Sequence, residues 1–430
     1  MSRSDLAKVA SAASIGSLVE WYDFFIAGSA AATVWPAIFF PKSSASAALA
    51  LSFSTFAVTY LARPIAAFTF GHFGDRAGRR TTLVWTLLTM AVAMFGIALT
   101  PAYASIGIVA PILIALFRFV QGFGIGGEWQ GGVVWVAEFT AGRKTRGFWT
   151  SVVQLANSLG LSIGTLAFYI ASIYAPGPAF EQWGWRVPFA VGGAVVIAGA
   201  IIRYRMAESP LFHRLQASGA MEKHPAVTVL RDNWKNIILL SFVISFVVVV
   251  ENLNLNPVGL SYLAAKGLKP PANLFIVGAA AAFSAIPLLL GAIWSDQTSR
   301  RRPMLVGIIL TLFMVYPFYL LVNTGSFAYA ALGAVALLAF PYIAYGVFPI
   351  AFSEFFPTKY RYSGVGLAFQ IGAIYTGLIL VAVVPYILGV AHGLLNAWPY
   401  LAGLSMLMTV VALICLLVAR RPKETDLETI

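Results

Sequence analysis

The feature that most constrains this chain is a succession of apolar stretches, each long enough to cross the hydrocarbon core of a bilayer as a helix of about twenty residues. Hydrophobic residues make up 60% of the chain and charged residues 10%, whereas soluble domains carry about 25% charged residues. We therefore predict an all-α membrane protein. Its twelve transmembrane helices are expected near residues 10–38, 47–72, 81–100, 106–139, 147–174, 185–206, 236–265, 272–294, 303–323, 327–356, 364–389 and 397–419.

Basic residues provide an independent test of that number of helices. Clusters such as 76–80, 143–146 and 300–302 fall in every second connection, and Arg203 and Arg205 fall in the longest of these. The positive-inside rule assigns such connections to the cytoplasm, and this assignment places both termini there as well. The net charge of +12 then reflects topology and contact with anionic lipid, so no nucleic-acid partner is expected.

Two charged signatures each occur twice, which indicates two similar halves. The first follows the second and eighth predicted helices and comprises Asp75, Arg79 and Arg80, then Asp296 and Arg300. The second follows the fourth and tenth and comprises Glu138 and Arg146, then Glu354 and Arg361. Because both signatures recur at nearly the same spacing, we predict six-helix units at residues 1–206 and 236–430, joined by a cytoplasmic linker at 207–235. Parallel repeats of this kind place a binding site between the halves near the midplane.

The same signatures predict an ionic latch on the cytoplasmic surface. Glu138 and Arg146 lie on one side of the membrane and form its first part, and Glu354 with Arg361 forms the counterpart. Such a latch holds one conformer and breaks as the halves rock. For Asp75 and the arginines that follow it, a solvated turn that serves only topology is the alternative.

Several motifs resemble those of one known family. Residues 71–80, GHFGDRAGRR, resemble the loop signature of the major facilitator superfamily, and Arg118 with Gln121 and the glycines that follow is similar to its second motif. Narrower features that are similar to the metabolite:proton symporter branch lie at residues 20–23, 61–64, 126–128 and 208–212. The resemblance implies two pseudo-symmetric six-helix bundles and a transporter that imports organic acids, oxo acids, shikimate, proline or betaine with protons.

Ionisable side chains lie inside the predicted helices: Glu20, Asp23, Arg63, Arg118, Glu128 and Glu251. Charges at this depth normally face a protein interior or a water-filled cavity, where they have a function. At roughly 1.5 Å per residue, Glu20, Arg63 and Glu128 share one level, so a cluster that only holds helices together is the alternative to a functional one. Asp23 and Arg118 differ in depth by roughly 10 Å on straight helices, but the resemblance implies that they pair.

Asp23 is the predicted proton carrier and Arg118 its partner, with Glu20 and Glu128 as the next candidates. A carboxyl between an apolar interior and an Arg can take up or release a proton as a cavity opens and closes. Protons are then the coupling ion, and no cofactor or metal is expected because the four histidines are scattered along the chain.

Amides and an acid gather in the seventh predicted helix, directly before Pro257. Asn252 and Asn256 are four residues apart and share a face, and Glu251 and Asn254 share a neighbouring one. Pro257 should break the helix. Hydrogen bonding between helices is the alternative to lining a cavity. Further lining candidates are Trp21, Tyr22, Arg63, Gln121, Gln154, Asn157, Tyr345 and Gln370.

These features together predict a monomeric secondary transporter in a prokaryotic cell membrane, which imports a small organic solute with protons by alternating access. With four buried acids against two bases, a monocarboxylate fits better than a polyanion. A zwitterion and a sugar or polyol are alternatives, and so is proton-coupled export, although the fifth predicted helix lacks the proline usual in such exporters. An enzyme is not expected, because no phosphate loop, metal-binding HExxH or nucleophile elbow is found.

Overall fold

The computed structural model describes residues 3–205, 217 and 223–419. The side chains of Arg3, Ala77 and Arg79 are outside that description. The motif predicted at 208–212 therefore lies outside the described residues, and so does the side chain of Arg79, which was predicted to belong to the latch.

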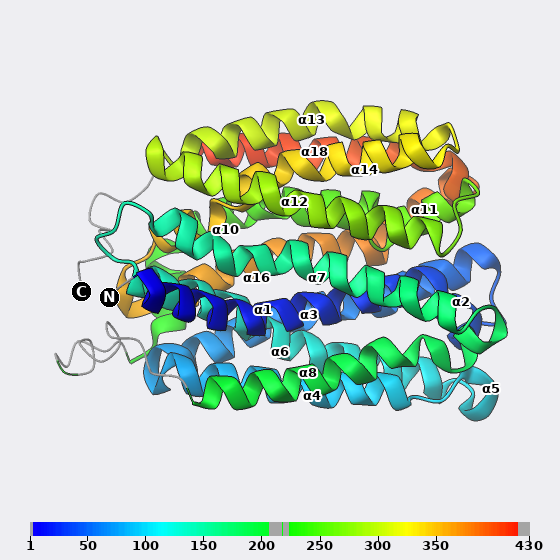
Figure 1. The fold of residues 1–430 in the computed structure, drawn as a ribbon, viewed down its shortest axis with the longest axis horizontal. Helices are drawn as coiled ribbons and strands as arrows, with labels where there is room; N and C mark the ends of the chain where they lie inside the picture. The colour runs from blue at the N-terminus through cyan, green and yellow to red at the C-terminus, as the bar shows by residue number, and fades with distance from the viewer. Residues whose placement is uncertain (1–2, 206–216, 218–222, 420–430) are drawn as a thin grey trace.

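Helices in the first half of the chain run along a common axis (Figure 1). We call these elements, α1 to α8, the N-terminal half. They are α1 (Arg3–Thr33), α2 (Trp35–Phe39), α3 (Ala45–Ala77), α4 (Arg79–Leu99), α5 (Tyr103–Ile106), α6 (Val109–Phe139), α7 (Arg146–Tyr174), the π-helical turn η1 (Phe180–Gly184) and α8 (Arg186–Tyr204).

Helices of the second half, α10 to α18, lie beside them, and we call these the C-terminal half. They are α10 (Pro225–Asn254), α11 (Val258–Ala265), α12 (Ala272–Gln297), α13 (Arg301–Asn323), α14 (Phe327–Tyr345), α15 (Phe348–Ser353), η2 (Thr358–Tyr360), α16 (Arg361–Leu378), η3 (Ile379–Val383), α17 (Val384–Val390), η4 (Leu394–Asn396) and α18 (Trp398–Val418). The last part of the predicted linker, from Pro225 onward, is thus helical.

Long apolar helices account for nearly all of the predicted membrane spans. Among the described residues, eleven helical segments are long and apolar enough to cross a membrane. The first predicted span corresponds to α1, which carries Glu20 and Asp23. It is not among those eleven segments. It nevertheless runs beside the other helices along the bundle (Figure 1). α1 begins and α18 ends at the same end of the bundle, which we call the terminal end.

Close packing of α6 on α3 depends on glycine. A Cβ atom at Gly122 would meet the carbonyl oxygen of Thr59, and one at Gly126 would meet that of Arg63. Small residues let helix backbones approach closely in lipid, where the hydrophobic effect does not drive helices together. Within the N-terminal half α1 also packs on α7, and between the halves α7 packs on α12 and α3 on α16.

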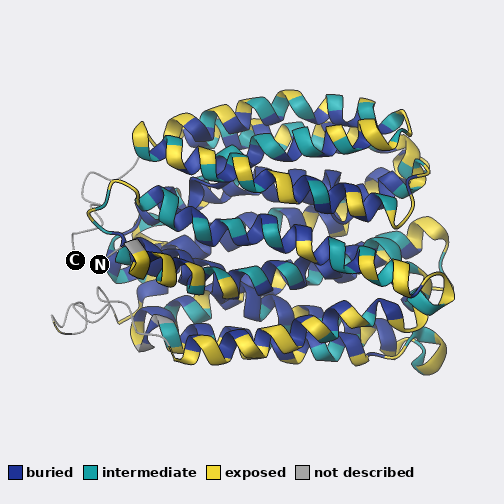
Figure 2. Cartoon of the chain, in the orientation of Figure 1, coloured by how far each residue is buried: buried dark blue, intermediate teal, exposed yellow. Residues whose placement is uncertain are grey.

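Burial follows the distinction between lipid and protein interior. Exposed residues lie on the outward faces of the peripheral helices, and buried residues lie on the inward faces (Figure 2). Trp85, Phe313 and Tyr386 are examples of large side chains on the outside. This is the reverse of a soluble protein and suits a bundle surrounded by hydrocarbon.

Two long helical segments of the C-terminal half are interrupted. α10 ends at Asn254 and α11 begins at Val258, so the predicted break at Pro257 is confirmed. The tenth predicted span divides into α14 and α15 between Tyr345 and Phe348. A broken helix leaves backbone groups without their helical partners, and this is tolerated at membrane depth only inside protein or beside water.

Candidate functional site

Polar side chains meet inside the bundle where the two halves face each other. They come from α1, α3, α6 and α7 on one side and from α10, α14 and α16 on the other. All of the following are buried: Glu20, Asp23, Arg63, Arg118, Gln121, Gln154, Asn157, Glu251, Asn252, Asn256, Tyr345 and Gln370. A buried polar group is costly unless it is hydrogen-bonded. Groups that have partners therefore hold helices together, and groups that have none are candidates for binding a solute.

Asp23 and Arg118 are joined through Gln121. The amide nitrogen of Gln121 donates to Oδ2 of Asp23, and Nη1 of Arg118 donates to Oε1 of Gln121. Arg118 also donates to the carbonyl of Phe56 at 3.2 Å, and its guanidinium lies 4.9 Å from the centre of the Phe56 ring. Gln121 lies one turn from Arg118 on α6, so its side chain spans the difference in depth predicted for the acid and the base.

Arg63 and Glu20 have polar atoms without partners. The guanidinium of Arg63 lies 4.6 Å from the ring centre of Phe24 and 4.8 Å from that of Tyr60. Within the described chain its Nε and Nη2 atoms have no acceptor, and neither carboxyl oxygen of Glu20 has a donor. The two side chains are electrostatic neighbours. Unused donors and unused acceptors thus lie in one buried region.

Glu128 is paired, and its partner corrects a prediction from the sequence. Nη2 of Arg203 lies 2.6 Å from Oε1 of Glu128, and the Thr86 hydroxyl donates to Oε2 at 2.9 Å. Arg203 also donates to the carbonyl of Ala13 at 2.8 Å. The assignment of Arg203 to a cytoplasmic connection is wrong, because α8 continues to Tyr204 and keeps this side chain inside the bundle. The pair links α1, α4, α6 and α8, and it lies close enough to Glu20 for Glu128 and Arg203 to interact with that carboxyl electrostatically.

Asn252, near the end of α10, and Asn256, in the break that follows, face the N-terminal half. The hydroxyl of Tyr60 donates to Oδ1 of Asn252 at 3.1 Å, and Nδ2 of Asn256 donates to the hydroxyl of Ser29 at 3.1 Å. Asn254 points elsewhere and donates to α18. Two amides therefore meet the other half, one from the last turn of α10 and one from the break before α11.

A tyrosine that the sequence analysis missed connects the halves at Glu251. The Tyr342 hydroxyl bonds to Oδ1 of Asn157 on α7 and lies 3.2 Å from Oε1 of Glu251. Tyr342 lies three residues before Tyr345, which was predicted. A buried carboxyl at Glu251 requires a donor, and this requirement is the signal that could have identified it.

Aromatic rings from both halves stack beside these amides. The Trp129 and Phe369 ring centres are 3.9 Å apart, and Nε1 of Trp129 donates to Oε1 of Gln154 at 2.7 Å. Gln370, one residue after Phe369, donates to Oε1 of Gln130 at 3.4 Å. Gln154 therefore bonds to one ring of the stacked pair, and Gln370 bonds across the halves to Gln130.

The central region contains further polar atoms without a partner in the described chain. They are Nε1 of Trp21, Nε2 of Gln154, Nδ2 of Asn157, Oδ1 of Asn256, the hydroxyl of Tyr345 and Oε1 of Gln370. Each buried group of this kind costs about 1–3 kcal/mol if nothing satisfies it. A small polar solute bound among them would supply the missing partners.

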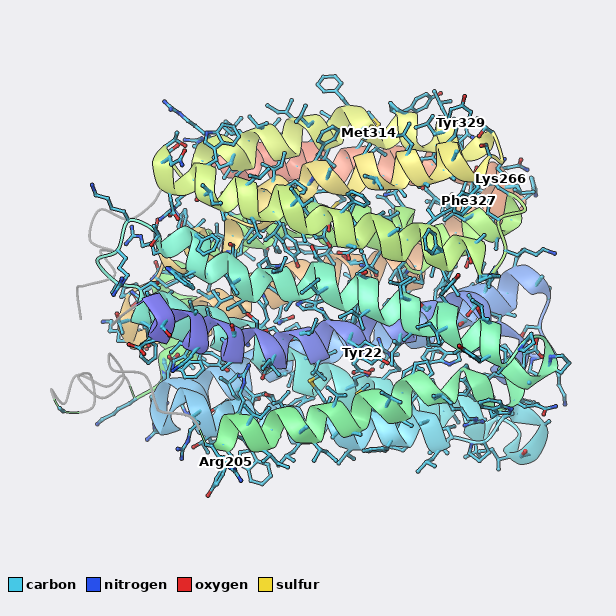
Figure 3. All side chains as sticks on the ribbon, viewed as in Figure 1. Tyr22, Arg205, Lys266, Met314, Phe327 and Tyr329 are labelled. Carbon is cyan, nitrogen blue, oxygen red and sulfur yellow. The ribbon has the colours of Figure 1, made fainter. Side chains whose placement is uncertain are left out.

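Tyr22 does not belong to this central region, contrary to its prediction as a lining residue. Its hydroxyl donates to the carbonyl of Pro188 on α8 at 2.8 Å, and Figure 3 shows the side chain between α1 and α8. The neighbouring Trp21 and Asp23 point elsewhere because successive helical residues are about 100° apart.

Two aspartates at the terminal end bind the first turns of helices in the opposite half. Oδ2 of Asp75, at the end of α3, accepts from the backbone and hydroxyl of Ser363 in α16 at 3.1 and 2.7 Å. Asp296, at the end of α12, accepts from the backbone nitrogens of Gly147 and Phe148 in α7, both at 2.9 Å. Carboxylates are favourable at helix N-termini, so each half holds the other in the same way.

The ion pairs of the latch cross between the halves. Arg146 lies 2.7 Å from Oε1 of Glu354, and Arg361 lies 3.8 Å from Oε1 of Glu138. Each pair thus joins one member of the first predicted latch group, Glu138 and Arg146, to one member of the second, Glu354 and Arg361. The pseudo-two-fold relation places equivalent elements opposite one another, so each acid meets the base of the other half.

Arg300 strengthens one of these pairs, whereas Arg80 lies elsewhere. Arg300 bonds to Asp296 at 2.6 Å and lies 3.3 Å from Glu354. The guanidinium of Arg80 lies 5.7 Å from the ring centre of Tyr204 on α8, within its own half. Arg80 is thus placed beside α8.

The crossed pairing predicts which substitutions are coupled. Arg146→Gln and Glu354→Gln should each shift the terminal end toward separation, and the double variant should add little, with a coupling of roughly 0.5–3 kcal/mol. Arg146→Gln with Glu138→Gln should instead be additive. Distances between spin labels on Lys144 and Lys359, measured by pulsed electron paramagnetic resonance, report the separation. Strong coupling of Arg146 to Glu138 would contradict the crossed arrangement.

The chemistry of the central region is that of binding. In the part of the chain that the structure describes, no three His, Cys, Asp or Glu side chains converge where a metal ion could bind. The groups present are hydrogen-bond donors and acceptors, charges and aromatic faces, and they lie between two halves that are joined by breakable contacts. Together with the membrane-spanning helices, this arrangement defines a multi-pass membrane transporter.

Comparison with known proteins identifies the family. The profile described as Major Facilitator Superfamily matches residues 14–375, and the chain belongs to that superfamily. It is 34% identical to the inner membrane metabolite transport protein YhjE of Escherichia coli K12, over 95% of this chain and 93% of that protein. It is 30% identical to the shikimate transporter of the same organism, over 88% of this chain and 87% of that one.

A solved structure shows the same fold. The proton:xylose symporter XylE bound to 6-bromo-6-deoxy-D-glucose superposes with a TM-score of 0.75 and covers 100% of this chain and 99% of its own, at 18% identity. The predicted all-α fold of the superfamily is confirmed. The chain is a multi-pass membrane transporter of small metabolites and not an enzyme.

Proposed function

We propose that this chain is a proton-coupled symporter in a prokaryotic cell membrane, and that it imports a small organic acid, most simply a monocarboxylate. The observation that supports the solute class is the buried Arg63, whose Nε and Nη2 atoms have no acceptor in the described chain. A guanidinium presents a fork of donors that matches a carboxylate. A solute carboxylate would supply the missing acceptors between the two halves.

Proton coupling is assigned to Asp23. Its carboxyl is held by Gln121, which also holds Arg118, so the charge of the acid and the position of the base are linked through one amide. Protonation of Asp23 would weaken its bond from Gln121 and free Arg118 to move. Because α1 and α6 carry these groups, such a change would be transmitted to helix packing and to the rocking of one half on the other.

The carboxyl group of Glu20 supports a second candidate class of solute. Both of its carboxyl oxygens lack donors in the described chain, and they lie near Arg63. A zwitterion would place its carboxylate on Arg63 and its cationic group on Glu20. Under this alternative Glu20→Gln should abolish transport of zwitterions, whereas a monocarboxylate symporter should keep its transport in that variant.

Uptake by the purified chain in proteoliposomes tests the proposal. We expect a labelled monocarboxylate to accumulate when the outside is made acidic, and a protonophore to abolish the accumulation. Uptake indifferent to the pH gradient would contradict proton coupling. Solute export driven by outside acid would indicate an antiporter, and accumulation of sugars alone would contradict the proposed class.

Arg63→Gln should weaken solute binding strongly. A hydrogen bond to a charged group contributes about 1.5–3 kcal/mol, so the half-saturating concentration of a monocarboxylate should rise roughly ten- to a hundredfold. Arg231→Gln is the matched control, because Arg231 is exposed and pairs with its neighbour Asp232. An Arg63→Gln variant with unchanged half-saturation would remove Arg63 from the binding site.

A further inference from the structure

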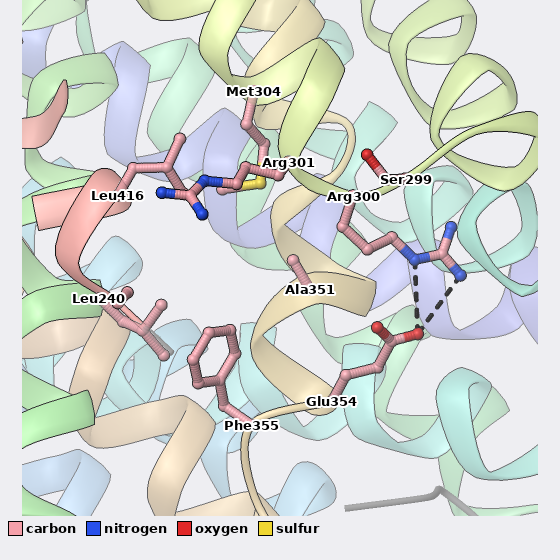
Figure 4. Close-up of a pocket in the computed structure, with 10 residues that line it drawn as sticks. Leu240, Ser299, Arg300, Arg301, Met304, Ala351, Glu354, Phe355 and Leu416 are labelled. Atoms are coloured by element: carbon pink, nitrogen blue, oxygen red, sulfur yellow. Dashed lines mark hydrogen bonds and ion pairs between the residues drawn. The ribbon is translucent and has the colours of Figure 1, made fainter. Parts of the chain in front are cut away.

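A cavity lies at the terminal end of the C-terminal half, apart from the polar central region. Its volume is about 280 Å³. Its walls come from α10, the start of α13, α15 and the end of α18 (Figure 4). The lining residues are Leu240, Ser299, Arg300, Arg301, Met304, Ala351, Glu354, Phe355, Leu416 and Ala419.

The lining of this cavity combines apolar and charged side chains. Leu240, Met304 and Leu416 are buried in the bundle yet border open space. Phe355 adds an aromatic face. Two adjacent arginines, at positions 300 and 301, also line the cavity, and their guanidinium groups point to different sides of it (Figure 4). A ligand that fits this lining has an apolar portion and an anionic group.

The two arginines differ in what already neutralises them. Arg300 bonds to Asp296 and Glu354, and Figure 4 shows its guanidinium directed at Glu354. Arg301 donates instead to the carbonyl of Leu417 at 2.7 Å, and in Figure 4 it extends toward Leu416. A carbonyl does not neutralise a guanidinium, so Arg301 is the residue suited to an additional anion.

The position of the cavity indicates where its ligand comes from. Arg301 is the first residue of α13, and Ala419 directly follows the last residue of α18, so the cavity lies where two transmembrane helices reach the membrane surface. Exposed side chains of α18 nearby, such as Ile414 and Leu417, are apolar and face lipid. A basic site at this level meets phosphate groups of lipids, with acyl chains directly below.

We propose that this cavity binds one anionic phospholipid, with its phosphate on Arg301 and part of an acyl chain against Leu240, Phe355 and Leu416. The charge of the site selects an anionic headgroup over a zwitterionic one, and the apolar wall selects a lipid over a soluble phosphate. The proposal does not depend on the solute or on proton coupling, so it can fail or succeed independently of the proposed function.

Native mass spectrometry of the full-length chain tests the proposal. Delipidated protein is titrated with phosphatidylglycerol and with phosphatidylcholine of the same acyl chains. Loss of one basic residue near the membrane surface weakens binding about fivefold, so Arg301→Gln should lower the preference for phosphatidylglycerol by about that factor. Arg301→Lys, which retains the charge, should preserve the preference.

Arg302→Gln is the matched control, since Arg302 is exposed and is not among the residues that line the cavity. It should change the preference less than twofold. Equal losses in Arg301→Gln and Arg302→Gln would overturn the proposal in favour of general attraction to a basic surface. Soluble glycerol phosphate that binds as tightly as the lipid would overturn it in favour of a site for free phosphate.

Discussion

Asp23→Asn should abolish uphill accumulation of solute, while exchange of labelled for unlabelled solute should continue. Asn has nearly the shape of Asp and can still accept the bond from Gln121. It cannot take up a proton, however, so the step that couples a proton to each transport cycle is lost. Counterflow requires only that the loaded protein alternates between its two sides, and this step does not need proton release.

Two measurements on the same proteoliposomes separate these steps. Accumulation is followed under an imposed pH gradient, and counterflow is followed with equal pH on both sides. Asp232→Asn is the control, because Asp232 is exposed and paired with Arg231, and it should preserve both activities. Equal loss of accumulation and counterflow in Asp23→Asn would assign Asp23 to binding or folding. Loss of accumulation in Glu20→Gln alone would make Glu20 the proton carrier.

Arg203→Leu should produce the largest loss of stability, because it leaves Glu128 buried without its cation. Breaking a buried ion pair in this way costs roughly 3–5 kcal/mol. The double variant with Glu128→Leu removes both charges and should recover most of that loss. Thermal unfolding in detergent, followed by tryptophan fluorescence, provides the comparison of midpoints.

Arg205→Leu is the matched control, two residues further along at the end of α8. Arg205 is exposed, and Figure 3 shows it at the outside of the bundle, so its replacement should leave the midpoint nearly unchanged. The double variant at 203 and 128 should still accumulate solute, since the pair is assigned to packing of α1, α4, α6 and α8. Loss of accumulation in a stable double variant would return Glu128 to the candidates for proton coupling.

The membrane-spanning architecture could be predicted from the sequence because hydrocarbon imposes a simple requirement. A helix must be long and apolar, and connecting segments must carry their charge on the correct side. The break at Pro257 could be predicted for a similarly local reason, since proline removes a backbone donor and clashes with the preceding turn. These properties depend on neighbouring residues in one segment and need no knowledge of the packing partners.

Side-chain partners could not be predicted in the same way. Glu354 is close in sequence to Arg361, yet the structure pairs it with Arg146 from the other half. Arg203 was assigned to a connection because it lies near the end of a span, and its long side chain instead reaches back to Glu128. Arginine can extend in this way with its charge several ångströms from its own backbone. Helix rotation and such reach decide the partner, and neither is a property of one segment.

In the central region, too, the sequence indicated which residues matter but not which of them are in contact. A carboxyl and an Arg at different depths were expected to pair, and the motif also contained Gln121, which joins them. Tyr342 was missed because tyrosine is common in apolar helices and has no distinctive spacing. Depth along a straight helix was a poor guide, since one amide side chain was enough to connect Asp23 and Arg118.

The crossed ion pairs have a further consequence for how such a molecule can arise. Each half contributes one acid and one base at equivalent positions, and each contributes an aspartate that holds the other's helix. A surface that carries both the acid and the base of such a pair is complementary to itself. Two copies of one six-helix unit could therefore form the same two ion pairs and two aspartate–helix contacts as a symmetric dimer. Joining the copies in one polypeptide then leaves these contacts in place and frees each copy to diverge in sequence.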